Sequence, residues 1–278
     1  LAFVRCHYPY AILAAAPFDL FPVSDDRPYF FHFHRWNDLG RARADLDTPM
    51  VVTQGNPLFL LGQLVLGVAL ALLLLVPTLR FASRAESGAR RRALPAFGYF
   101  GSIGAGYIVL QVALLQKLVL LLGHPLHSLT VPLFVMLLAT GAGAFLSRGA
   151  FSADAPARRL WWIPLGLAVW LGAFAFASED LTRWAVPLPA LARFAVAGAV
   201  VAPVGLLLGV PFAHGIASLA RRWPALVPWA WAANAATPVV GSIVAVIVSI
   251  NFGFDAVFAV GVALYARAAS SVKGLTED

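Results

Sequence analysis

Residues 58–79 read LFLLGQLVLGVALALLLLVPTL, a stretch without a single charged side chain. An α-helix needs about 20 mainly apolar residues to cross roughly 30 Å of hydrocarbon, so this stretch predicts a membrane span. Six more apolar stretches follow, at 97–121, 126–147, 161–178, 190–210, 228–250 and 252–268. Because helices satisfy their own backbone hydrogen bonds within lipid, the pattern predicts an all-α integral membrane protein, with a polytopic bundle of about seven transmembrane helices over 58–268.

The composition agrees with this class. Hydrophobic residues make up 60% of the chain and charged residues only 12%, against about 25% charged in an ordinary soluble domain. The mean hydropathy is +0.81. We therefore expect a multi-pass protein of the cell membrane. The single cysteine, Cys6, excludes an internal disulfide framework and a four-cysteine metal site.

The net charge of +7 is spread unevenly along the chain. Arginines cluster after the first, third and fifth predicted spans, and Arg267 and Lys273 close the last one. By the positive-inside rule these loops and the tail 269–278 lie in the cytoplasm, and residues 1–57 lie outside. Basic loops beside a membrane favour the lipid bilayer as partner, and we expect no nucleic acid.

Residues 1–57 form a short mixed soluble tail in this interpretation. Four prolines, at positions 9, 17, 22 and 28, exclude a long helix. We expect one short helix near 8–16, extended pieces around 28–34 and a polar linker at 37–56. Because so short a segment cannot bury a core of its own, we expect it to pack on an upstream soluble domain of a longer parent chain. The start at Leu1, without a signal sequence, favours the same interpretation.

The densest charged group is Ser24-Asp25-Asp26-Arg27-Pro28. Asp25, Asp26 and Arg27 are typical of a turn with Asp–Arg pairing, but they also suit contact with a cationic ligand. Within the predicted spans, Gln111, Gln116 and Asn234 either tie helices together or line a cavity. The histidine pair 32/34 lacks a third ligand, and Pro125 between His124 and His127 favours a turn over a metal-binding helix, so no metal site is expected.

Glycines 101, 104 and 106 lie inside an apolar span rather than after a strand. Small residues there let helices approach closely, so we expect a packing role and no phosphate-binding loop. The chain therefore has no predicted cofactor and no predicted catalytic residue.

A series of motifs runs from residue 8 to about residue 268. Its members are Tyr8-Pro9-Tyr10, Ala16-Pro17-Phe18-Asp19-Leu20, Ser24-Asp25-Asp26-Arg27-Pro28-Tyr29-Phe30, Gly104-Ala105-Gly106-Tyr107, Gln111-Val112-Ala113-Leu114-Leu115-Gln116-Lys117, Gly209-Val210-Pro211-Phe212, Trp229-Ala230-Trp231-Ala232-Ala233-Asn234 and Asn251-Phe252-Gly253-Phe254. In order and spacing this series resembles the membrane part of membrane-bound spermidine-synthase-like proteins, a major-facilitator-type region fused to a spermidine-synthase or methyltransferase-like domain.

The resemblance implies polyamine-type aminopropyl or methyl transfer, with an S-adenosylmethionine-type cofactor, in the full-length parent only. The amide at Gln111 stands where this family would have an acidic residue, which argues against proton-coupled transport. Two other classes stay open. The chain is alternatively a transporter-like module for a small solute, cations included, or a membrane anchor without chemistry. The side of the membrane also stays open, because such cofactors are cytosolic and the charge rule places residue 1 outside.

Overall fold

The computed structural model describes residues 24, 26–29, 36, 40, 56–85, 89–149, 151 and 156–272. Within these residues nearly all of the chain is helical, and the only β feature is an isolated bridge between Ser24 and Arg27. The predicted helix at 8–16 and the histidines at 32 and 34 lie outside the described residues, as do Asp25 and almost all of the predicted linker.

Six of the helices are long and apolar enough to cross a membrane, so the described part of the chain has the architecture of a multi-pass membrane protein. The α-helices are α4 (Pro57–Ala85), α5 (Ala89–Lys117), α6 (Val119–Leu122), α7 (Pro125–Leu146), α8 (Trp162–Ala185), α9 (Ala190–Arg222), α10 (Val227–Phe252) and α11 (Phe254–Ser271). Two 3₁₀ helices, η2 (Ala157–Trp161) and η3 (Pro224–Leu226), lead into α8 and α10. The six long helices confirm the predicted class, whereas the shorter α11 is not one of them.

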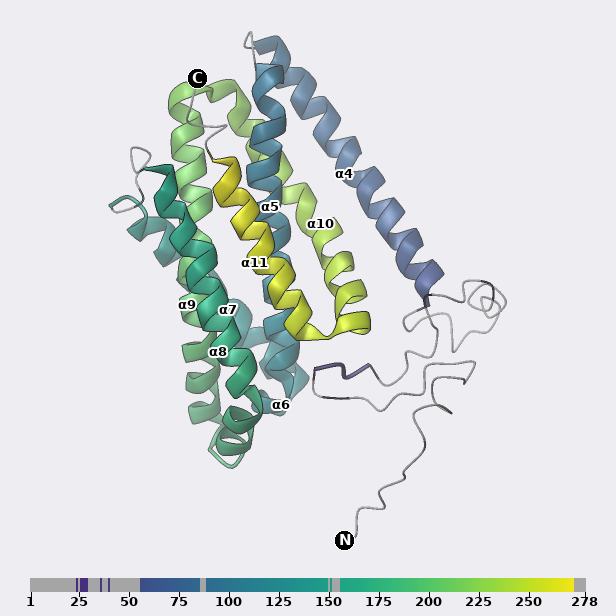
Figure 1. Cartoon of the computed structure of the whole chain (residues 1–278), viewed down its shortest axis with the longest axis vertical. Coiled ribbons are helices and arrows are strands. Elements are labelled where there is room, and N and C mark those ends of the chain that lie inside the picture. The colour runs from purple at the N-terminus through teal and green to yellow at the C-terminus, as the bar shows by residue number, and fades with distance from the viewer. Residues whose placement is uncertain are drawn as a thin grey trace.

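Helix α5 lies in the middle of the bundle (Figure 1). It contacts α10 and α11 extensively and also touches α4, α7 and α9. On one side of it α4 leans against α10, and on the other side α7, α8 and α9 form a second group. Helix α11 bridges the two groups, because it packs on α5 and α10 and also on α8.

Glycines make the tightest of these contacts possible. A Cβ atom on Gly143 would overlap the Leu206 carbonyl, and one on Gly209 would overlap the Thr140 carbonyl, so α7 and α9 touch backbone to backbone. Gly104 meets the Asn234 carbonyl of α10 in the same way. The packing role predicted for the glycines of α5 is thereby confirmed, since small residues are what let helices approach this closely in membranes.

The predicted end of the fifth span at residue 210 is wrong. Helix α9 continues without a break to Arg222, and His214, which lies beyond the predicted end, is a buried helical residue. Pro211 does not stop the helix. A proline removes one backbone donor, and here its own carbonyl also accepts a hydrogen bond from the Tyr99 hydroxyl at 2.7 Å.

The predicted span 97–121 covers parts of two helices and is not a single one. Helix α5 ends at Lys117 and α6 begins at Val119, although hydrogen bonds from Leu118 N to Leu114 O and from Leu122 N to Leu118 O carry the helical pattern across. Gly123, with φ of 69°, then reverses the chain before α7. Only glycine adopts such a left-handed conformation without cost.

The alternating helix directions gather the arginine-rich connections at one end of the bundle (Figure 1). This end contains the last turns of α4, α7, α9 and α11 and the first turns of α5, α8 and α10. We call it the basic end. The opposite end holds α6, the α10–α11 turn and residues 24 and 26–29, and we call it the acidic end for the reason given next.

Candidate functional site at the acidic end

Lys117 joins three separate parts of the chain. Its Nζ lies 2.7 Å from Asp26 Oδ1 and 3.0 Å from Asp255 Oδ1. Lys117 is the last residue of α5, Asp255 lies in the first turn of α11, and Asp26 precedes the bundle. The lysine side chain is only 8% exposed. A buried ammonium is tolerated only when it is paired, so the two carboxylates are what allows Lys117 to sit there.

Asp26 also caps α11. Its Oδ1 accepts hydrogen bonds from the backbone N–H groups of Phe254 and Asp255, each at 3.1 Å. The first N–H groups of a helix have no partner within the helix, and the local N-cap residue, Gly253, has no side chain to offer. A carboxylate from a distant segment therefore does the work of the N-cap, and its charge suits the positive end of the helix dipole.

Gly253 makes this capping sterically possible. Its φ is 84°, and a Cβ atom built there would overlap Asp26 Oδ2. The turn between α10 and α11 thus needs glycine twice, once for the backbone conformation and once for the room that Asp26 occupies.

Two neighbours of Asp26 tie the same segment to the end of α10. Arg27 Nε donates to the Ile250 carbonyl at 2.9 Å, and the Tyr29 hydroxyl lies 2.5 Å from Ser249 Oγ. The Tyr29 ring also packs on Phe254, with 5.9 Å between the ring centroids. Burial raises the pKa of the Tyr29 phenol, so the hydroxyl stays protonated. We call residues 24 and 26–29 the docked segment.

The docked segment is shaped by a turn. Arg27 N–H donates to the Ser24 carbonyl at 2.9 Å, and Ser24 Oγ lies 3.2 Å from the same nitrogen. A serine at the start of such a turn is a frequent arrangement. The turn directs Asp26 toward α11 and Arg27 toward α10, so neighbouring charges serve different helices.

A cavity of about 670 Å³ opens beside the cluster. Its charged lining consists of Asp26, Asp255, Lys117, Glu179 and Asp180. On the rim, Arg183 lies 3.2 Å from Glu179 Oε2 and 3.6 Å from Asp180 Oδ1, in pairs that are largely exposed. Carboxylates outnumber the cations around this opening, which favours a positively charged occupant.

The sequence-predicted polar residues are only partly brought together. Gln116 lines the cavity beside Lys117. Gln111 and Asn234 are half-buried in α5 and α10 and do not line it. Sequence reasoning did not connect Lys117 with Asp26 and Asp255. The available signal was a lysine, rare in this chain, at the end of a span, with an acidic residue at the start of another.

The histidines of the same end have structural partners. His124 Nδ1 accepts a hydrogen bond from Leu126 N–H at 3.2 Å and so caps α7, and the His127 ring packs edge-on against Phe194. Among the residues that the structure describes, no three His, Cys, Asp or Glu side chains gather as a metal site would require.

Comparisons of the chain with protein-family models, with curated proteins and with solved structures find no match.

Proposed function

We propose that this chain is the membrane domain of a spermidine-synthase-like protein of the cell membrane, and that it holds the segment before its first helix against the acidic end of the bundle. The family part of the proposal rests on the motif series between residues 8 and 268. The observation that carries the docking is Asp26, which pairs with Lys117 and caps α11. Because Arg27 and Tyr29 bind α10 next to it, the docked segment is part of the bundle.

We further propose seven spans, with α11 as the seventh. Its 18 residues correspond to about 27 Å at 1.5 Å per residue, close to the thickness of the hydrocarbon core. Its packing on α5, α8 and α10 supports this placement. With the basic end in the cytoplasm, the docked segment lies outside. Aminopropyl or methyl transfer stays with the soluble domain that the family resemblance implies, and we assign no catalytic residue to this chain.

The docking is testable by chymotrypsin, which cleaves after tyrosine. Tyr29 is half-buried and bonded to Ser249, so cleavage after Tyr29 is expected to be slow in the detergent-solubilised chain. Asp26→Ala should accelerate it. The matched control is Asp180→Ala, which removes an exposed carboxylate at the same end and should leave the rate unchanged. Equal cleavage in the original chain and in Asp26→Ala would refute the docking.

The acidic cavity favours a second function, the binding of a small cationic solute. Asp26, Asp255, Glu179 and Asp180 would attract an amine, and the exposed Phe176 in the lining offers it an apolar contact. The test is thermal melting with and without spermidine, against sodium chloride at equal ionic strength. Stabilisation by spermidine that Glu179→Gln abolishes supports binding. Stabilisation that sodium chloride reproduces is charge screening and counts against it.

A further inference from the structure

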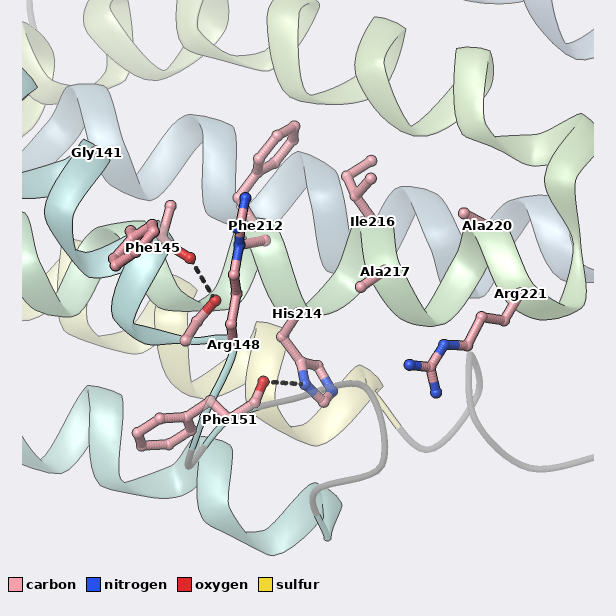
Figure 2. A pocket seen from close by; sticks show the side chains of 13 residues that line it. Gly141, Phe145, Arg148, Phe151, Phe212, His214, Ile216, Ala217, Ala220 and Arg221 are labelled. Atoms are coloured by element: carbon pink, nitrogen blue, oxygen red, sulfur yellow. Dashed lines mark hydrogen bonds between the residues drawn. The ribbon is translucent and has the colours of Figure 1, made fainter.

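A second cavity, of about 720 Å³, lies at the basic end between α7 and α9. Figure 2 shows its lining, which comes from the last turns of both helices and from Phe151 in the connection after α7. The last turns of α7 and α9 lie at the basic end (Figure 1). Because arginine-rich connections mark the cytoplasmic side of a membrane protein, a cavity at this end is within reach of the lipid headgroups.

The polar part of the lining is positively charged. Arg148 follows α7 and Arg221 belongs to the last turn of α9, and both side chains are exposed. In the view of Figure 2 they stand on opposite sides of His214. No described residue in the lining carries a carboxylate. In the sequence the one carboxylate of the following loop is Asp154, which lies outside the described residues.

His214 gives the cavity a fixed wall. The residue is 1% exposed, and its Nδ1 lies 3.0 Å from the Phe151 carbonyl. This contact holds the connection after α7 against α9 (Figure 2). His214 and Phe151 therefore give the cavity a wall that does not depend on the two arginine side chains.

The rest of the wall is apolar. Phe145, in the last turn of α7, and Phe212 of α9 line the cavity, and Arg148 lies over the Phe145 ring with its guanidinium carbon 5.2 Å from the centroid. Gly141 leaves room, since a Cβ atom added there would meet nothing within 4 Å. The cavity thus combines a cationic mouth with an apolar, partly empty interior.

We propose that this cavity binds an anionic phospholipid, with the phosphate between Arg148 and Arg221 and the upper part of an acyl chain along Phe145 and Gly141. Basic pockets between membrane helices on the cytoplasmic side suit anionic headgroups. The backbone adds no attraction, because α7 and α9 both end here and the C-terminal end of a helix dipole is negative. The arginine side chains must therefore supply the selectivity for charge.

The experiment is native mass spectrometry of the whole chain in detergent, with phosphatidylglycerol and phosphatidylcholine of equal chain length as competing probes. Retention of phosphatidylglycerol over phosphatidylcholine is expected. Arg148→Ala with Arg221→Ala should weaken that retention roughly 30-fold, about 5.4-fold for each arginine at a charged membrane surface. The matched control is Arg84→Ala with Arg91→Ala, which removes the same charge at the same end from exposed positions outside the cavity and should change little.

A second variant tests the apolar part without touching the arginines. Gly141→Leu fills the empty interior and should lower phosphatidylglycerol retention, while Gly62→Leu, at another glycine with open space around it, should not. Both changes replace glycine by a better helix former, so folding should be preserved. Equal retention of the two lipids, equal loss in both arginine pairs, or displacement of the lipid by millimolar inorganic phosphate, which would indicate a site for soluble anions, would overturn the proposal.

Discussion

Replacing Asp26 by alanine tests whether one side chain outside the spans stabilises the whole bundle. The change removes the ion pair with Lys117 and both side-chain hydrogen bonds to the start of α11. It leaves Lys117 paired with Asp255, which is 3.0 Å away and half-exposed. The loss is therefore partly compensated, and the expected effect is smaller than for a fully buried pair.

The magnitude follows from the two contributions. Loss of an N-cap side chain costs about 1 kcal/mol. Removal of one partner of a charged, poorly exposed group costs roughly 1–3 kcal/mol, and the 31% exposure of Asp26 places this contribution toward the lower end. We expect Asp26→Ala to lower the free energy of unfolding by about 2–3 kcal/mol. Asp26→Asn keeps an oxygen for capping and should cost about half as much.

The assay is equilibrium unfolding in mixed detergent micelles, followed by helical circular dichroism. Asp180→Ala is the control, because its carboxylate is 88% exposed and pairs with the exposed Arg183. Surface pairs of this kind contribute about 0–1 kcal/mol. If Asp26→Ala destabilises the chain no more than Asp180→Ala, the capping and pairing argument is wrong.

Three further predictions address the turn, the helix contact and the topology. Gly253→Ala should lower the free energy of unfolding by at least about 1 kcal/mol, because the backbone has a positive φ there and the new Cβ atom would overlap Asp26. Gly172→Ala, in open space, should be neutral or stabilising. Equal effects of the two changes would contradict the close approach of Asp26 to Gly253. Gly209→Leu should cost about 1–3 kcal/mol by forcing α9 away from Thr140, and a melting temperature like that of Gly62→Leu would refute the backbone contact. The topology is tested with single cysteines in a Cys6→Ser background and an impermeant thiol reagent added to intact cells. The reagent should label cysteines at positions 127 and 182 but not those at positions 91, 158 and 221. Equal labelling at positions 91 and 127 would show the topology to be wrong.

The sequence alone was sufficient for the membrane class and for the approximate position of every long helix. Hydrophobic length is a local property, so a window such as 58–79 can be interpreted without knowledge of its neighbours. The ends were less accurate. Helix α9 passes Pro211 and reaches Arg222. Its glycines contact α7 near this point, and the Tyr99 hydroxyl of α5 donates to the Pro211 carbonyl. These contacts stabilise α9 past the proline, and they depend on the other helices.

The candidate site was only half predictable. The sequence singled out Asp26 and Arg27 as a turn or a ligand contact, and Gln116 as a polar residue in a span. It did not place Lys117 or Asp255 beside Asp26, because the three are far apart in the chain and meet only when α5 and α11 pack together.

The amino-acid sequence by itself determined which segments are apolar enough to enter lipid and that the cations gather in alternate loops. Only the tertiary structure decided that Asp26 caps α11, that Gly253 makes room for it, and that Arg148 and Arg221 flank one cavity. The physical reason is the distance along the chain over which each effect acts. Transfer into lipid is a sum over neighbouring residues, whereas caps, ion pairs and cavities depend on distances between segments that only the packed helices bring together.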